Sequence, residues 1–422
     1  MPTFDLQGTR CQRPEGDADC GTEKPLVKPH IITAQGSRAA TPPGLKRDVG
    51  RFARLTSLLA SDERLVQERA EGIRVGLYRL YGELGSGNSA TVRLAVHQLT
   101  TERVAVKVVD RAKLDHKKRE MLTEEVTSME RLHHPNIIRL YEVVESPRHI
   151  YLVMEYAPAG DLERRVSREG PLTEADARSV FSQLLAAVQH MHSKKLVHRD
   201  IKAENVFFAS RSRVKLGDLG FSRRVSGIGE HLTQFCGSPS YSAPELLSAA
   251  SYRGDRADLW ALGVLLFFSV TGRLPFDGAS LAELRRHILA VRYRWPAGVG
   301  SEPCRELVAA LLQRDPAARP SAAEAGRCRW LNGHPPPAAG RSLSLRAAPV
   351  TAQEREARAR LRQLGVSETT LESHRRRGCH SPVTGLYRMV LHRVCREEEE
   401  SGGSGKQLWL RGGDRCKQCT IL

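Results

Sequence analysis

The sequence has no apolar segment long enough to cross a membrane, and it is poor in aromatic residues. Its longest apolar run, residues 259–270, is shorter than the roughly 20 residues that span a bilayer, so we expect a buried helix there. Aromatic residues make up 5% of the chain, and none of its basic stretches is interleaved with aromatics, as stacking on nucleic-acid bases requires. We therefore expect no transmembrane span and no nucleic-acid partner, although the formal net charge is +17.

The cysteines are scattered, and no secretory signal is recognisable. The nine cysteines have irregular spacing, and no apolar signal core follows Met1. Cys416 and Cys419 lack the second pair that a zinc site of this kind requires. We expect free thiols, a reducing compartment and a cytoplasmic monomer.

The composition divides the chain into segments. Residues 1–54 mix Gly, Pro, Thr and charge without apolar periodicity, which predicts disorder, and residues 55–77 have apolar residues at helical spacing, which predicts a helical lead-in. The main domain at 78–331 is followed by a linker rich in Pro and Ala at 332–352. A smaller folded unit at 353–396 and a flexible tail at 397–422 complete the predicted organisation.

The main domain changes its apolar period halfway. Residues 78–156 alternate apolar and polar positions with many β-branched residues, interrupted by one helical stretch at 119–132, which predicts a small sheet with one helix. Residues 172–331 have helical periods, as in 175–192 and 280–291, broken by short loops. The fold class is therefore α+β, with a small β-rich lobe and a large, mostly helical lobe.

A glycine-rich segment at 84–92 stands between two predicted strands. Gly85 and Gly87 let backbone N–H groups approach phosphate oxygens, although an ordinary hairpin turn has the same composition. Lys107 lies in the next strand, where its ammonium can reach phosphates, and Glu125 on the following helix can pair with it. A surface lysine and a solvated helix face would look the same, so these residues alone decide nothing.

The most specific pattern is the string HRDIKAEN at residues 198–205. Asp200 can accept the proton of an attacking hydroxyl, and Lys202 can neutralise charge on a transferred group. Asn205 offers a hard oxygen ligand for magnesium. Such a string predicts phosphoryl transfer.

Two further strings follow in the expected order. DLG at 218–220 comes after a predicted strand and supplies a second magnesium ligand, Asp218. APE at 243–245 closes the intervening segment. We expect Glu245 to bury its charge against Arg319, as a structural pair.

Together these strings resemble the signatures of eukaryotic serine/threonine protein kinases over residues 78–331. HPNIIRLY at 134–141, CGSP at 236–239 and WALGVLL at 260–266 are similar to the CaM-kinase-like group related to the AMP-activated kinase, and VTGLYRMVLHR at 383–393 resembles its Nim branch. The resemblance implies a two-lobed protein kinase fold, ATP and Mg2+ as cofactors, protein Ser/Thr hydroxyls as acceptors, an upstream kinase as a partner, and a role in intracellular signalling.

The resemblance also assigns roles to residues. The implied catalytic set is Asp200, Lys107, Glu125 and Lys202, and the implied metal ligands are Asn205 and Asp218. The implied nucleotide-binding set comprises Leu84, Gly85, Ser86, Gly87, Asn88, Ser89, Ala90, Thr91, Val92, Ala105, Lys107, Glu155 and Ala157. Asp161 and Glu204 stand where related kinases read arginine, so we expect basic residues near the acceptor.

Two positions in the catalytic machinery depart from the family pattern. Leu219 replaces a phenylalanine and is expected to pack with His198 and Met129. Ser89 replaces an aromatic residue at the tip of the glycine-rich loop, which would expose the phosphates to water and lower turnover.

The largest departure is Gln234, at the position of the threonine that an upstream kinase phosphorylates. Arg199 thereby loses the phosphate that would order this segment. Thr233 and Ser238 are the nearby hydroxyls. We expect activation to be constitutive or moved to Thr233.

A pseudokinase or scaffold that keeps the fold and acts by binding is the alternative function. Leu219, Ser89 and Gln234 argue for it, whereas the intact catalytic and metal-binding residues argue against it.

The end of the chain carries two more expectations. LRQLGV at 361–366 resembles the start of a ubiquitin-associated-like unit, which in the wider family contacts the catalytic domain, so the resemblance implies a regulatory role. CTIL at 419–422 fits a prenylation box at Cys419, with Cys416 as a second acyl site, although Thr420 is not aliphatic. Prenylation would give reversible membrane contact, and an unmodified tail is the alternative.

Overall fold

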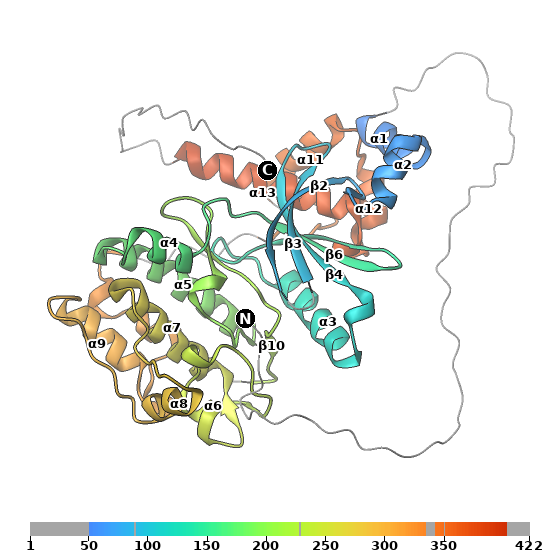
Figure 1. The fold of residues 1–422 in the computed structure, drawn as a ribbon. Helices are drawn as coiled ribbons and strands as arrows, with labels where there is room; N and C mark the ends of the chain where they lie inside the picture. Colours follow the sequence, from blue (N-terminus) through green and yellow to red (C-terminus); the bar gives the residue numbers. More distant parts are fainter. Residues whose placement is uncertain (1–49, 88–89, 228, 335–341, 350, 403–422) are drawn as a thin grey trace, which may run out of the picture.

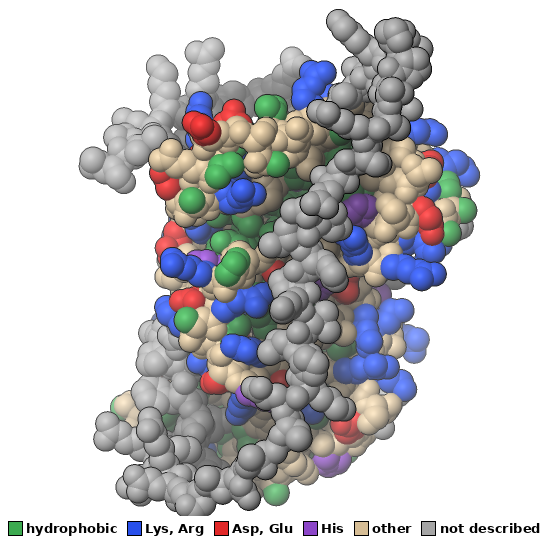
Figure 2. All heavy atoms as spheres, turned by 90° about the vertical axis from the view of Figure 1, so that its right-hand side faces the viewer, with side chains coloured by type: hydrophobic (Ala, Val, Ile, Leu, Met, Phe, Trp, Pro, Cys, Tyr) green, Lys and Arg blue, Asp and Glu red, His purple; other side chains and the backbone are tan. Residues whose placement is uncertain are grey.

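A computed structural model describes residues 50–87, 90–227, 229–334, 342–349 and 351–402. The chain forms a smaller lobe built on a curled sheet and a larger helical lobe, and its last helices lie against the smaller lobe (Figure 1). The predicted α+β, two-lobed fold is confirmed. The face drawn in Figure 2 carries Lys and Arg side chains with Asp and Glu between them, in keeping with the net charge of +17.

The smaller lobe contains an antiparallel sheet with the strand order β1-β2-β3-β4-β6-β5. Its strands are β1 (Arg74–Val75), β2 (Tyr78–Ser86), β3 (Ala90–His97), β4 (Arg103–Asp110), β5 (Leu140–Glu145) and β6 (His149–Glu155). The helix predicted at 119–132 is α3 (His116–Arg131). It begins earlier because Asp115 caps it, accepting a 2.8 Å hydrogen bond from the Lys118 N–H.

The two faces of this sheet have different roles. Side chains alternate between faces along a strand, so Val104 and Val106 lie on one face of β4 whereas Ala105 and Lys107 lie on the other. Val104 and Val106 belong to a buried cluster that includes Met389 from the end of the chain. The sheet is therefore covered by C-terminal residues on one face and carries the predicted nucleotide-binding residues on the other.

The larger lobe packs its helices around one almost fully buried helix, α7 (Gly254–Thr271), which contains the apolar run at 259–270. Around it lie α4 (Leu162–Glu169), α5 (Glu174–Ser193), α6 (Pro244–Ser248), α8 (Leu281–Leu289), α9 (Glu302–Leu311) and α10 (Ala322–Ala325). Its short strands are β7 (Leu196–Val197), β8 (Val206–Phe208), β9 (Val214–Leu216), β10 (Arg223–Arg224), β11 (His231–Leu232) and β12 (Tyr252–Arg253). In the part of the chain that the structure describes, no helix has the length and apolar character needed to cross a bilayer.

The two ends of the described chain meet on the smaller lobe. The lead-in forms α1 (Arg51–Ser61) and α2 (Glu63–Ala70), and the C-terminal unit forms α11 (Ala352–Gln363), α12 (Glu368–Arg375) and α13 (Pro382–Gly402). The Phe52 N–H donates a 2.9 Å hydrogen bond to the Leu364 carbonyl. Figure 1 shows α1 and α2 beside α11 and α12. Segments far apart in the sequence thus share one small core.

Three segment boundaries differ from those expected from composition. Helix α1 begins at Arg51, inside the segment predicted to be disordered, because Phe52 packs against the C-terminal unit. Leu343 and Leu345, in the predicted linker, are buried in the same core. Helix α13 continues to Gly402, past the predicted start of the tail at 397. The remaining predicted disorder at 1–49 and the tail at 403–422 lie outside the described residues.

Helix α13 is fixed to the outer face of the sheet by polar contacts as well as by packing. Arg388 lies 2.9 Å from Glu130 Oε1 on α3 and donates to the backbone carbonyls of Leu140 and Tyr141 at 3.5 and 3.3 Å. Arg393 and Arg396 both pair with Glu102, in the turn before β4. The C-terminal unit therefore contacts the helix that carries Glu125 and two segments of the sheet.

Candidate active site

The predicted lysine–glutamate pair is formed. Lys107 Nζ lies 2.7 Å from Glu125 Oε1 and 3.7 Å from Asp218 Oδ1. Burial by itself would lower the pKa of Lys107, but the two carboxylates outweigh it and raise the pKa above its ordinary value. Lys107 therefore carries a fixed positive charge where β4, α3 and the DLG segment meet.

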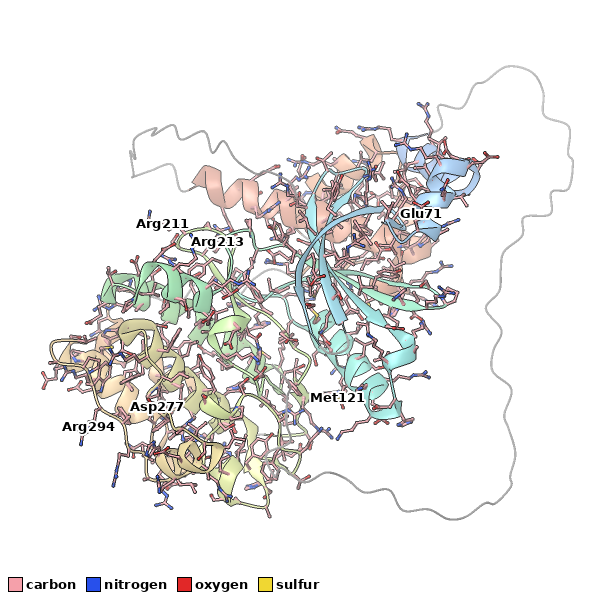
Figure 3. The ribbon with its side chains drawn as sticks, in the orientation of Figure 1. Glu71, Met121, Arg211, Arg213, Asp277 and Arg294 are labelled. Atoms are coloured by element: carbon pink, nitrogen blue, oxygen red, sulfur yellow. The ribbon has the colours of Figure 1, made fainter. Side chains whose placement is uncertain are left out.

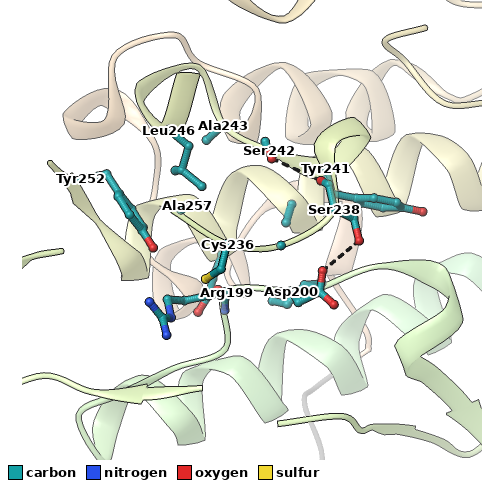
Figure 4. Close-up of a pocket in the computed structure, with 14 residues that line it drawn as sticks. Arg199, Asp200, Cys236, Ser238, Tyr241, Ser242, Ala243, Leu246, Tyr252 and Ala257 are labelled. Carbon is teal, nitrogen blue, oxygen red and sulfur yellow. Dashed lines mark hydrogen bonds between the residues drawn. The ribbon is translucent and has the colours of Figure 1, made fainter. Parts of the chain in front are cut away.

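The HRDIKAEN loop brings its polar residues together. Asp200 Oδ2 lies 3.0 Å from Lys202 Nζ, and Asn205 Nδ2 donates to the Asp200 carbonyl at 2.8 Å. The Ser238 hydroxyl donates to Asp200 Oδ1 at 3.0 Å, and Lys202 Nζ donates to the Ser238 oxygen at 3.0 Å. Figure 4 shows Ser238 facing Asp200 across the cavity between this loop and the following segment. The carboxylate of Asp200 is thus held in one orientation.

Asp258, on α7, holds the backbone of this loop in place. Its carboxylate accepts hydrogen bonds of 2.9 Å from the backbone N–H groups of His198 and Arg199 and lies 2.9 Å from His192 Nε2. Burial raises the pKa of Asp258, but the bond to His192 and the neighbouring His198 outweigh it and lower the pKa below its usual value. Arg199 has a φ of 68°, a strained conformation for a residue with a side chain, which these bonds hold in place.

Asp218 occupies the other side of the cleft. Its side chain is about half exposed, at 46%. Burial raises the pKa of Asp218, but the attraction to Lys107 outweighs this effect and lowers the pKa below its ordinary value. The next residue, Leu219, is 1% exposed and lies in the same buried cluster as Met129. Leucine at this position therefore anchors the segment to the core, as expected for its apolar side chain.

The donors at the predicted metal site suit magnesium. Asn205 donates its amide N–H group to Asp200. Its amide oxygen makes no hydrogen bond to a described residue and is available as a ligand. Asp218 supplies an exposed, ionised carboxylate. Oxygen donors of this kind and number fit Mg2+, which completes its shell with water and substrate phosphates.

The described residues of the predicted nucleotide-binding set, other than Glu155, lie on the strands next to Lys107 or in the connection that follows β6. Residues 84–87 and 90–92 form the facing ends of β2 and β3, and Val92 is paired in register with Lys107. Asn88 and Ser89 lie outside the described residues. Ala105 pairs with Met154, and Ala157 packs against the main core. The side chain of Glu155 lies on the opposite face, 2.7 Å from Lys215 Nζ, and its backbone N–H donates to the Arg139 carbonyl, so only its carbonyl remains to contact a nucleotide.

The segment around Gln234 is ordered without a phosphate. Tyr252 donates its hydroxyl to the Gln234 carbonyl at 2.9 Å, and Phe235 packs against the Tyr252 ring at a centroid distance of 5.7 Å. Arg199 Nε donates to the Phe221 carbonyl at 2.6 Å, whereas its buried Nη1 has no partner among the described residues. Thr233 is exposed.

The expected structural pair is confirmed. Arg319 makes two hydrogen bonds of 2.7 Å to the carboxylate oxygens of Glu245, and both side chains are buried. This bidentate pair ties the end of the APE segment to the larger lobe.

Two residues of the site were missed or misassigned from the sequence. The sequence motifs do not single out Asp258. An aspartate near the start of an otherwise apolar helix is nevertheless a recognisable signal, because a buried charge needs partners. The sequence suggests Ser238 only as an alternative phosphorylation site. In the structure it bonds both Asp200 and Lys202.

Comparisons with known proteins agree with this geometry. The protein kinase domain family matches residues 78–331. Serine/threonine-protein kinase SIK1 of Mus musculus is 40% identical over 269 residues, which cover 64% of this chain and 34% of that protein. The serine/threonine-protein kinase SIK3 homolog of Danio rerio is 41% identical over 265 residues, which cover 63% of this chain and 22% of that protein.

The chain belongs to the protein kinase family. Its similarity to these serine/threonine-protein kinases supports the predicted group related to the AMP-activated kinase, and the Nim branch stays a prediction. The matched region spans about a third or less of the length of these curated relatives.

Proposed function

We propose that this chain is a serine/threonine kinase that transfers the γ-phosphoryl group of Mg-ATP to hydroxyls of other proteins in intracellular signalling. The observation that carries the proposal is the set of contacts around Lys107, which is paired with Glu125 at 2.7 Å and lies 3.7 Å from Asp218. Lys202, 3.0 Å from Asp200, is close enough to lower the pKa of Asp218, so the HRDIKAEN loop lies beside the same group of residues. A site with this pair formed needs no rearrangement of α3 before it can act.

Each residue has a distinct task. Lys107 holds the α- and β-phosphates, and Asp200 orients the acceptor hydroxyl and takes its proton. Lys202, 3.0 Å from Asp200, neutralises the charge that develops on the transferred group. Asn205 and Asp218 would hold magnesium, which when bound would offset the negative charge of the phosphates. Most of the rate enhancement then comes from positioning and electrostatic stabilisation.

We infer that the activation segment works without a phosphate at position 234. The Tyr252–Gln234 hydrogen bond and the packing of Phe235 on Tyr252 support this inference. Phosphorylation of Thr233 by an upstream kinase is the alternative mode of control.

The two acidic residues expected to read a basic substrate residue, Glu204 and Asp161, differ in how available their carboxylates are. Glu204 is exposed, as a contact to a substrate arginine requires. Asp161 caps α4 and lies 3.3 Å from Arg164 Nε, so Glu204 is the stronger candidate for reading a basic residue.

The proposal is tested by phosphate transfer from ATP to a peptide array by the full chain, with and without magnesium. We expect Asp200→Asn to lower the rate by roughly 10²- to 10⁴-fold, the usual contribution of a general base. Asp277→Asn is the matched control, since this exposed aspartate belongs to the loop between α7 and α8 of the larger lobe (Figure 3). ATP binding without any transfer by the wild type would instead support the pseudokinase alternative.

Location and lipidation are separate proposals. We infer a cytoplasmic monomer. Cys416 and Cys419 lie outside the described residues, so membrane contact through a prenylated Cys419 rests on the sequence alone. The intact mass of the protein isolated from eukaryotic cells distinguishes a prenylated tail from an unmodified one.

A further inference from the structure

A second cavity lies behind the connection between the lobes, on the face of Glu155 that is turned away from Lys107. It has a volume of about 630 Å³, within the range of small-molecule sites. Residues from the turn before β4, the strand β5 region, the interlobe connection, the loop between β8 and β9, and α13 all line it. We call it the hinge cavity. Helix α13 supplies one wall of it through His392, Cys395, Arg396 and Glu399.

The lining of the hinge cavity is rich in cationic side chains. These are Arg103, Arg139, Arg213, Lys215 and Arg396, against the carboxylates Glu102, Glu155 and Glu399. Figure 3 shows Arg211 and Arg213 on the loop between β8 and β9, above α4. Counting side chains as charged gives five cations and three anions, so the lining carries a net positive charge.

Each lining carboxylate is already engaged. Glu155 lies 2.7 Å from Lys215 Nζ and 3.4 Å from Arg139 Nη1. Arg396 pairs with Glu102, and Arg213 Nη1 lies 3.3 Å from Glu399. Burial raises the pKa of Glu155, but the cations Lys215 and Arg139 outweigh it and lower the pKa to about 2. Each of these carboxylates is therefore paired with a cation of the lining itself.

Donors are left over after these pairs are formed. Arg139 is 8% exposed, and its Nε–H group has no acceptor among the described residues. The exposed guanidinium of Arg103 likewise forms no ion pair with any residue that the structure describes. The Nε–H of Arg139 is itself sealed from solvent, and of the other guanidinium nitrogens only Nη1 is bonded to described residues. Arg103 and Arg139 thus bring charged donors without a described acceptor to the lining, and an anion from outside the chain would satisfy them.

We propose that the hinge cavity binds a small phosphate monoester. Guanidinium groups match phosphate oxygens in geometry as well as in charge, and Arg103 and Arg139 supply such groups. The volume exceeds what a free phosphate ion fills. Pro158, Ala209 and Cys395 offer surface for the organic part of the ligand.

The ligand bridges three parts of the protein. Arg103 and Arg139 belong to the smaller lobe, Arg213 and Lys215 to the larger lobe, and Arg396 to α13. A bound dianion therefore favours the state in which α13 is docked and stiffens the connection between the lobes. Because binding is measured directly, its failure leaves the proposed phosphate transfer untouched.

The test is calorimetric titration of the full chain at constant ionic strength with inorganic phosphate, glycerol 3-phosphate and, as a neutral control, glycerol. We expect saturable one-to-one binding of both phosphates, tighter for the monoester, and none of glycerol. Arg139→Gln and Arg103→Gln should each weaken binding by roughly tenfold or more, the effect of one charge-assisted hydrogen bond. Arg294→Gln, at an exposed site in the larger lobe (Figure 3), should leave it unchanged.

Two variants keep the test decisive. Arg103 has no described partner to lose, so Arg103→Gln reports on binding even if Arg139→Gln releases α13. Lys107→Met removes the phosphate contact in the catalytic cleft and should retain phosphate binding. The proposal is overturned if neither phosphate binds saturably, if Arg103→Gln binds as well as the wild type, or if Lys107→Met alone abolishes binding.

Discussion

Lys107 Nζ lies 2.7 Å from Glu125 and 3.7 Å from Asp218, so one ammonium group joins the sheet, helix α3 and the DLG segment. The charge of Lys107 would be misplaced without Glu125, because the attraction to Asp218 alone would pull it across the cleft.

We therefore predict that Glu125→Gln lowers kcat/KM by roughly 10²-fold, the cost of a misplacement of about 1 Å. The preceding residue offers a matched control, since Glu124 is exposed and makes only a 3.9 Å contact to Arg223. Steady-state assays of Glu125→Gln and Glu124→Gln compare the two. Equal rates for both variants would contradict a positioning role for Glu125.

The second prediction concerns the activation segment. If the Tyr252–Gln234 bond orders this segment, Thr233→Ala should retain activity within about twofold, because Thr233 is exposed and an exposed site away from special contacts contributes little. Tyr252→Phe should lower activity several-fold, because it removes the hydroxyl and keeps the ring. Both variants are assayed beside phosphosite mapping of the wild type. Loss of activity in Thr233→Ala, with phosphate on Thr233 in active protein, would show that control has moved to Thr233.

The third prediction concerns the attachment of the C-terminal unit. Arg388→Ala removes an ion pair to Glu130 and two bonds to β5 carbonyls. We expect a loss of about 2 kcal/mol in the free energy of docking, since hydrogen bonds to charged groups contribute about 1.5–3 kcal/mol. Hydrogen exchange of the amides of β5 measures the release of α13. Arg362→Ala, at an exposed position on α11, controls for the loss of an arginine and should leave the exchange unchanged.

The fourth prediction concerns pH. His392 is buried, with Nδ1 2.7 Å from the Tyr141 hydroxyl and Nε2 3.1 Å from Arg139 Nη1. Since arginine only donates, Nε2 accepts and the ring is neutral. Burial, together with Arg139 and against the attraction of Glu155, lowers the pKa of His392 well below 6.5.

The sign of the pH effect follows from that lowered pKa. The docked form binds fewer protons than the released form, so docking is fully favoured above the released pKa of about 6.5 and weakens as the pH falls below it, by about 1.4 kcal/mol per unit. Hydrogen exchange of α13 between pH 5 and pH 7.5 measures this slope. In His392→Gln the slope of the docking free energy against pH should fall by about 1.4 kcal/mol per pH unit, the contribution of one proton. An unchanged slope would assign the pH dependence to other buried histidines such as His97, whose pKa burial lowers to about 3.

The proximity of the predicted catalytic residues could be foreseen where they share one short string, because local spacing limits where the side chains can go, and their catalytic roles stay a prediction. Asp200, Lys202 and Asn205 share one tight loop, so their proximity follows from the sequence. Asp258 could not be placed in this way, since its bonds to His198 and Arg199 cross about sixty positions of the chain. The role of Ser238 at Asp200 is likewise a contact between distant segments.

The fold class and the protein kinase signatures could be predicted from the residues alone, because periodicity and contiguous polar strings are local properties. Two features were visible only in the folded chain. Helices α1 and α13 share a core with the linker residues Leu343 and Leu345, and Glu155 turns its side chain away from Lys107 toward α13. These outcomes depend on which apolar faces and buried charges find partners across the whole chain. The hinge cavity arises from the same long-range packing, and no single segment encodes it.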